Sequence, residues 1–123
     1  MDKIKILHII TEQTRFKLLQ LLFEHHYCVK ALSKKLNISE PAVSQHIRVL
    51  KKHDIVTGVK IGYQVHYQVN KTLIVSILTE LLQNISQYPE EVKITKDWNC
   101  TCEFISECIR RDSKILEEQG YGK

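Results

Sequence analysis

The chain has 123 residues, of which 43% are hydrophobic, and a formal net charge of +4. This length allows one compact domain with a core. Residues 25–70 carry a net charge of +5, whereas residues 88–123 carry a net charge of −2, and such a concentrated positive field favours a polyanionic partner. Because the sequence has no glycine-rich phosphate loop, no C-x-x-C pair and no acid–base pair at a recognisable spacing, we do not expect an enzyme.

The longest apolar segment, residues 73–82, is interrupted by polar side chains. It is too short and too polar to span a membrane, and the first residues do not form a signal peptide pattern. We therefore expect a cytoplasmic protein without a membrane partner. In that compartment thiols stay reduced, so the four cysteines suggest metal or redox chemistry before structural disulfides.

Apolar periodicity predicts two helices before the basic segment, over residues 3–10 and 13–24. The second is apolar all round, with Phe16 and Phe23 among its residues, which predicts a core helix buried on most sides. A polar turn, residues 24–27, follows. It contains two adjacent histidines, for which a solvated turn is favoured over a metal site.

Two helices joined by a tight turn are predicted next, over about residues 28–36 and 39–53. Asn37 ends the first apolar stripe, and Ser39 is a good N-cap for the second helix. Val43, Ile47 and Leu50 mark the buried arc of the second helix, and His46 is expected to share it. This pattern indicates a helix-turn-helix.

The opposite arc of the second helix carries small and amide side chains first and cations further along. This order suits a helix that enters a DNA major groove, where Gln45 could read a base edge and the cations could contact phosphates. The residues expected at DNA from this helix are Ser39, Glu40, Pro41, Ser44, Gln45, Arg48, Lys51 and Lys52.

After residue 54 the pattern changes to β-branched and aromatic residues in two runs, 55–61 and 63–69, joined around Gly62. Two strands after a recognition helix form a wing whose tip can lie along the DNA. The tip residues expected at DNA are Lys60, Tyr63 and Gln64.

Four stretches of this region carry a family likeness: Thr14-Arg15 at the start of the core helix, HYCVKALSKKL, NISEPAVSQHIRVLKKHDIV and IGYQVHYQV. Together they resemble the ArsR/SmtB family of bacterial metal-sensing repressors, although Tyr63 stands where an arginine is usual in the wing. The resemblance implies a homodimer that binds operator DNA, for which an inverted repeat is expected, and releases it when an effector binds.

The expected fold is mainly α with a small β-hairpin wing. Asn70 is predicted to cap a further helix whose apolar stripe is wider than a small domain needs. In the family this helix and the N-terminal one form the dimer interface, which here implies Ile4, Leu7, Ile74, Ile77, Leu78, Leu81 and Ile85. We expect residues 1–87 to form this domain and residues 88–123 a cysteine-containing tail with a helix.

The resemblance also bears on the cysteines. Of the family's cysteine pair in the first DNA-binding helix only Cys28 is present, and residues 70–87 lack the Asp and His of its zinc site. Some arsenite-responsive members carry three cysteines in the tail, where this chain has Cys100, Cys102 and Cys108. Three thiolates select soft centres, so the expected effector is As(III), or Cd, Pb or Zn with Cys28 as a possible fourth ligand.

Three other interpretations stay open. Cys108 lies on an apolar stripe and would also fit as a small core residue. The thiols would equally suit a redox-sensing or persulfide-sensing repressor of the same fold. A thiol metal-buffering protein that does not bind DNA would share the tail but would not need the helix-turn-helix.

Overall fold

The computed structural model describes residues 2–92, 94 and 101–107. The chain divides into two units, Met1–Tyr88 and Pro89–Lys123. No helix among the described residues is long and apolar enough to cross a membrane. The elements of the first unit are α1 (Lys3–Thr11), α2 (Gln13–Glu24), β1 (Tyr27–Cys28), α3 (Val29–Leu36), α4 (Glu40–Lys52), β2 (Val56–Ile61), β3 (Gln64–Val69) and α5 (Lys71–Ser86).

The turn between α3 and α4 is fixed by local hydrogen bonds. Asn37 ends α3 in the left-handed region (φ 55°), which asparagine tolerates better than most residues. Ser39 then caps α4, because its Oγ accepts from the Ala42 N–H at 3.2 Å. Pro41 lies in the first turn of α4, where its missing N–H is not needed. The predicted helix-turn-helix and its cap are confirmed.

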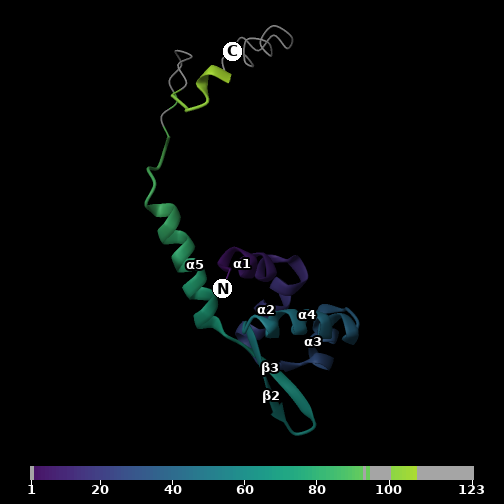
Figure 1. Ribbon diagram of the computed structural model, residues 1–123. Coiled ribbons are helices and arrows are strands. Elements are labelled where there is room, and N and C mark those ends of the chain that lie inside the picture. Colours follow the sequence, from purple (N-terminus) through teal and green to yellow (C-terminus); the bar gives the residue numbers. More distant parts are fainter. Residues whose placement is uncertain (1, 93, 95–100, 108–123) are drawn as a thin grey trace. The chain divides into compact units, whose positions relative to one another are not determined.

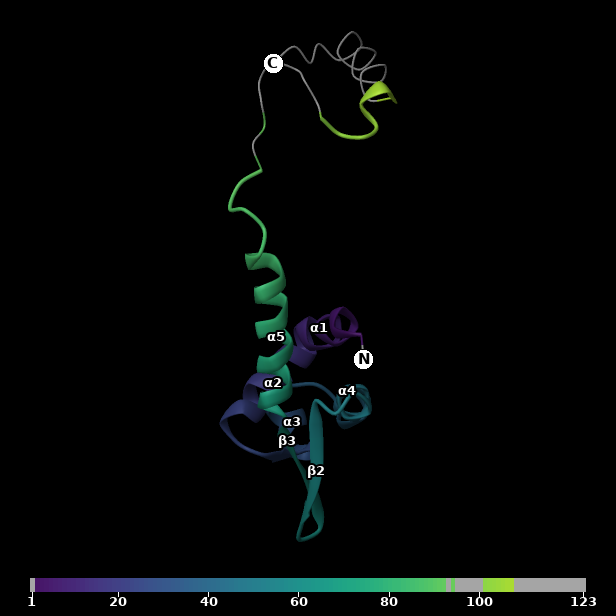
Figure 2. The same ribbon diagram turned by 60° about the vertical axis from the view of Figure 1, so that its left-hand side comes forward.

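The sheet is antiparallel with strand order β1-β3-β2. Strands β2 and β3 pair from Val56↔Val69 to Ile61↔Gln64, which leaves a two-residue loop. Gly62 opens that loop at φ 63°, a conformation that tight hairpin loops require and that glycine adopts without strain. In both views the β2–β3 hairpin projects from the helical body as a wing (Figure 1, Figure 2).

Strand β1 is not predicted from the sequence. Residues 24–27 are predicted as a polar turn, but Tyr27 and Cys28 form β1 and pair with Tyr67 and His66 of β3. As a result α3 begins at Val29. A two-residue strand is too short for its period to be visible in the sequence, and it joins the helix-turn-helix to the wing.

The core lies where α1, α2, α3, α4 and the base of the wing meet. Its fully buried side chains are Ile6, Leu18, Leu19, Leu32, Val43, Leu50, Ile55 and Val56. The prediction that α2 is buried on most sides is wrong, since Phe16 and Phe23 are each 42% exposed. A domain with so few elements cannot surround a helix, so only one side of α2 is covered.

Helix α5 has two apolar faces with different environments. Ile74 and Ile77 were expected in a dimer interface but belong to the core of the chain itself, at 6% and 4% exposure. Leu78 remains half exposed, Leu81 is half-buried, and Ile85 is 68% exposed. Among the described residues the exposed apolar side chains of α5 are Val75, Leu78, Leu82 and Ile85.

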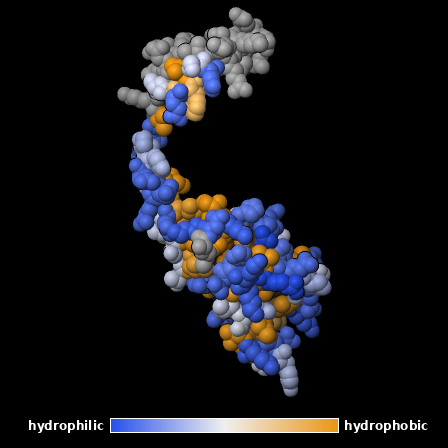
Figure 3. Space-filling model, viewed as in Figure 1, coloured by the Kyte–Doolittle hydropathy of each residue, from blue (hydrophilic) through white to orange (hydrophobic). Residues whose placement is uncertain are grey.

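The exposed face of α5 continues onto α1. Of the α1 residues expected in the interface, Ile4 is exposed and Leu7 is half-buried. The two helices lie side by side, joined by an ion pair between Lys3 and Glu80. Figure 3 shows apolar surface beside these helices. Clustered apolar side chains of this kind are typical of a surface that meets another protein.

The two faces of α5 can be separated by mutation. We expect Ile77→Glu to lower the free energy of unfolding by about 3–5 kcal/mol, because it buries an unpaired charge. Leu82→Glu should leave the helical circular dichroism unchanged, because Leu82 is 65% exposed, but should weaken self-association in sedimentation velocity. A Leu82→Glu protein that self-associates as strongly as the wild type would contradict the assignment of this face.

Candidate nucleic-acid interface

One side of helix α4 is buried in the core, and the other side is exposed to solvent. Val43, Ile47 and Leu50 are buried against the core. The 3.6-residue period then directs Ser44, Gln45 and Arg48 to solvent. We call the exposed residues of this helix and its N-cap the open face of α4: Ser39, Glu40, Pro41, Ser44, Gln45, Arg48, Lys51 and Lys52.

The tip of the wing is also exposed. Lys60 lies near the end of β2, Tyr63 in the loop and Gln64 at the start of β3, and all three are accessible to solvent. The wing therefore presents one cation, one phenol and one amide, which can donate to phosphate or contact the sugar–phosphate backbone. All eleven residues predicted at DNA from the sequence are exposed.

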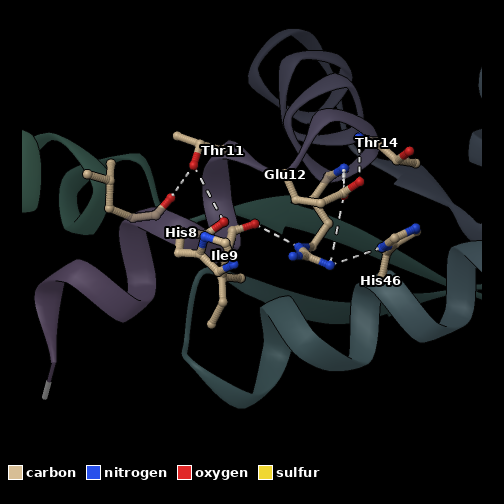
Figure 4. Close-up of polar contacts among 8 residues, drawn as sticks. His8, Ile9, Thr11, Glu12, Thr14 and His46 are labelled. Atoms are coloured by element: carbon tan, nitrogen blue, oxygen red, sulfur yellow. Dashed lines mark hydrogen bonds and ion pairs between the residues drawn. The ribbon is translucent and has the colours of Figure 1, made fainter. Parts of the chain in front are cut away.

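A polar network joins α4 to the junction between α1 and α2 (Figure 4). Arg15 donates from Nε to the Ile9 carbonyl at 2.7 Å, and its Nη1 lies 3.5 Å from His46 Nδ1. The same Nη1 is 3.9 Å from Glu12 Oε2. His46 is half-buried rather than fully part of the buried arc. Arg15 thus links the end of α1 and the start of α2 to α4, a role that its position in the sequence does not reveal.

Glu12 is the N-cap of α2. Its carboxylate accepts from the Thr14 N–H at 3.1 Å and from the Arg15 N–H at 2.8 Å. The bond from the Arg15 N–H is the largest cause that holds the pKa of Glu12 below its usual value. Burial opposes the shift, while the Thr14 N–H and the positive charges of Arg15 and His46 support it.

Only one of the three tail cysteines lies among the described residues. Cys102 is exposed, and its Sγ lies 3.4 Å from the Phe104 backbone nitrogen. Residues 105–107 are helical. Cys100, Cys108 and the rest of the predicted tail helix lie outside the described residues. Within the residues that the structure describes, no three His, Cys, Asp or Glu side chains are arranged to hold a metal ion.

The structure brings together histidines that are far apart in the sequence. His26 Nδ1 lies 2.9 Å from His66 Nδ1, and the His25 ring is 4.2 Å from the His26 ring. Desolvation, followed by the nearby His25 and His66, lowers the pKa of His26. The sequence alone does not reveal this cluster, because it depends on strand β1. The pairing of Cys28 with His66 brings His26 next to His66.

Comparison with known proteins agrees with this geometry. Residues 12–57, from the N-cap of α2 to the start of the wing, match the model for bacterial regulatory proteins of the arsR family.

Over these residues the chain is similar to the arsR family.

The transcriptional repressor SdpR of Bacillus subtilis is 27% identical over 78 residues, which cover 63% of this chain and 87% of SdpR. The arsenical resistance operon repressor of Staphylococcus aureus is 29% identical over 100 residues, which cover 81% of this chain and 88% of that repressor.

Among solved structures, a possible transcriptional regulator for arsenical resistance is similar with a TM-score of 0.56 and 28% identity. The match covers 73% of this chain and 99% of that protein. By their names, the two relatives are transcriptional repressors, and the solved structure is a possible transcriptional regulator. The open face of α4 and the wing tip therefore form the candidate DNA interface.

The Glu12 cap predicts a specific pH dependence. Because the folded-state pKa is lowered, the cap stabilises the fold above the unfolded-state pKa, and this contribution is lost as pH falls through the folded value. At neutral pH, Glu12→Gln should lower the free energy of unfolding by about 0.3–1 kcal/mol, and the difference should shrink in acid. Glu24→Gln, at the exposed end of α2, is the control. Urea unfolding at several pH values measures both, and a difference that does not depend on pH would contradict the charged cap.

Proposed function

We propose that this protein is a homodimeric repressor of the ArsR family that binds an inverted-repeat operator. We further propose that it leaves the operator when As(III) or a soft metal ion binds the tail cysteines, Cys100, Cys102 and Cys108. The observation that carries the DNA part is the burial of Val43, Ile47 and Leu50, which leaves the rest of α4 open. The soft effector is supported by the thiolate chemistry and by the name of the Staphylococcus aureus relative.

Each part of the open face has a different expected role. Gln45 can pair bidentately with adenine, and Ser44 can contact a neighbouring base edge. Arg48, Lys51 and Lys52 lie further along the helix and are suited to phosphates, whose contacts set affinity without reading sequence. Dimerisation through α1 and the exposed face of α5 would present two copies of α4 to two half-sites about one helical turn apart or a multiple of it.

The roles of Gln45 and Arg48 can be separated by their effect on specificity. We expect Gln45→Ala to reduce discrimination at one base position by about 1–3 kcal/mol. Arg48→Ala should weaken binding to all operator variants alike and reduce the salt dependence by about one counterion. Lys5→Ala, an exposed cation on α1, is the control and should change neither. Gel shifts with single-base operator variants measure this, and an unchanged ranking of variants for Gln45→Ala would exclude this helix face.

The proposal that the effector is As(III) or a soft metal ion rests on coordination chemistry. As(III) takes three thiolates, and the tail supplies three within nine residues, Cys100, Cys102 and Cys108. Soft thiolates disfavour Mg, Ca and Mn. Zn would prefer a fourth ligand, for which the half-buried Cys28 is a candidate. The alignment with the Staphylococcus aureus repressor covers 81% of this chain, more than the helix-turn-helix and wing alone.

The tail cysteines can be tested without disturbing the DNA interface. We expect each tail Cys→Ser variant to lose operator release by arsenite and to keep the operator affinity of the effector-free protein, because no tail residue lies on the open face of α4. Cys28→Ser should change the arsenite response little. The effector must bind the DNA-incompetent state more tightly than the competent one, since equal affinities would shift nothing. Operator release is measured by fluorescence anisotropy under reducing conditions, and a normal arsenite response in the triple variant would exclude this site.

A thiol-based redox or persulfide sensor of the same fold is the second candidate. It is supported by the accessibility of the described thiols, since Cys28 is partly exposed and Cys102 is exposed, which oxidation requires. Release by a persulfide donor but by no ion would favour it. A thiol metal-buffering protein would bind the ion but fail to shift any genomic fragment.

A further inference from the structure

Three histidines gather at the base of the wing although they come from two distant segments. His25 and His26 follow α2, and His66 lies in β3, 40 residues beyond His26. The pairing of Tyr27 with Tyr67 and of Cys28 with His66 brings them together. The proposed DNA interface does not include these histidines, and neither does the proposed effector site on the three tail cysteines.

The geometry of the closest pair is specific. The Nδ1 atoms of His26 and His66 are 2.9 Å apart, and the two rings meet edge to face at 69°. In the metal-free protein one ring donates a hydrogen bond to the other. If that ring moves its proton to Nε2, both Nδ1 lone pairs become available at no change in net charge.

The separation of the two nitrogens can be compared with the ligand spacing of each coordination geometry. With metal–nitrogen bonds of about 2.0–2.1 Å, two tetrahedral ligands lie about 3.4 Å apart, whereas two ligands at a right angle lie about 2.9 Å apart. The observed 2.9 Å matches the right angle, which is found in square-planar and octahedral sites. Such sites with nitrogen ligands favour Cu²⁺ and Ni²⁺ over Zn²⁺.

We propose that His26 and His66 bind one Ni²⁺ or Cu²⁺ ion through their Nδ1 atoms, at adjacent positions of a square-planar or octahedral site. His26 is exposed and His66 is half-buried, so water can enter the remaining positions. Within the described residues no group of three His, Cys, Asp or Glu side chains could hold a metal ion, so the proposal assigns two protein ligands to the ion. It differs from the proposed site on Cys100, Cys102 and Cys108 in its ligands, which are imidazole nitrogens instead of thiolates, and in its place in the chain.

The proposed ion would cross-link two segments of the sheet. His26 precedes β1, which leads directly into α3 at Val29, and His66 lies in the middle of β3. An ion held by both would fasten the start of the helix-turn-helix to the wing. Anything that binds the folded state and not the unfolded one raises the melting temperature, so binding should be visible without DNA.

The test uses tag-free, full-length protein in which Cys100, Cys102 and Cys108 are replaced by Ser, so that the tail thiolates cannot bind the probe. Titration with Ni²⁺ by calorimetry should give one site per chain. His26→Gln and His66→Gln should each weaken Ni²⁺ binding at least tenfold, whereas His8→Gln, an exposed histidine on α1, should not. Ni²⁺ should raise the melting temperature of the His8→Gln protein and leave that of the His26→Gln protein unchanged.

Two further readouts do not depend on the histidine variants. Cu²⁺ bound to the protein with all histidines intact should show hyperfine splitting from two nitrogens in its electron paramagnetic resonance spectrum. Ni²⁺ affinity should fall between about pH 8 and about pH 6, because protons compete for the imidazoles. Equal Ni²⁺ affinity of the His26→Gln and His8→Gln proteins, or a thiolate-to-nickel charge-transfer band, would overturn the proposal.

Discussion

The burial of one side of α4 determines most of what this molecule can do. Val43, Ile47 and Leu50 are almost inaccessible to solvent, and each fully buried aliphatic side chain contributes about 1.5–3 kcal/mol. Because these three residues fix the rotation of the helix about its axis, they also decide which side chains remain outside. Gln45 and Arg48 are exposed as a direct consequence.

The position of α4 is also tied to α1 and α2, because Arg15 links these helices. Its side chain contacts the end of α1 through the Ile9 carbonyl, the start of α2 through Glu12, and α4 through His46. An arginine can do this because its guanidinium offers several donors in a fixed plane. The helix proposed to read DNA and one of the two helices proposed to meet a second copy are therefore physically connected within one chain.

Much of the fold could be predicted because its signals are local. Ser39 and Asn70 cap helices, Gly62 opens the hairpin loop, and the apolar period of α4 gives its buried side. The features that were missed depend on tertiary contacts. β1 exists only because β3 lies beside it, and Ile74 and Ile77 turn inward because the body of the domain lies on that side of α5. Neither the Arg15 network nor the His26–His66 pair has a spacing that the sequence would reveal.

The central claim is that DNA meets the open face of α4 and the wing tip, while a second copy of the chain meets α1 and α5. Backbone amide NMR of the labelled protein titrated with its own promoter DNA tests this most directly. The account predicts large shifts at Ser44, Gln45, Arg48 and Tyr63 and small ones at Leu82 and Ile85. Large shifts confined to α1 and α5, with α4 unchanged, would contradict it.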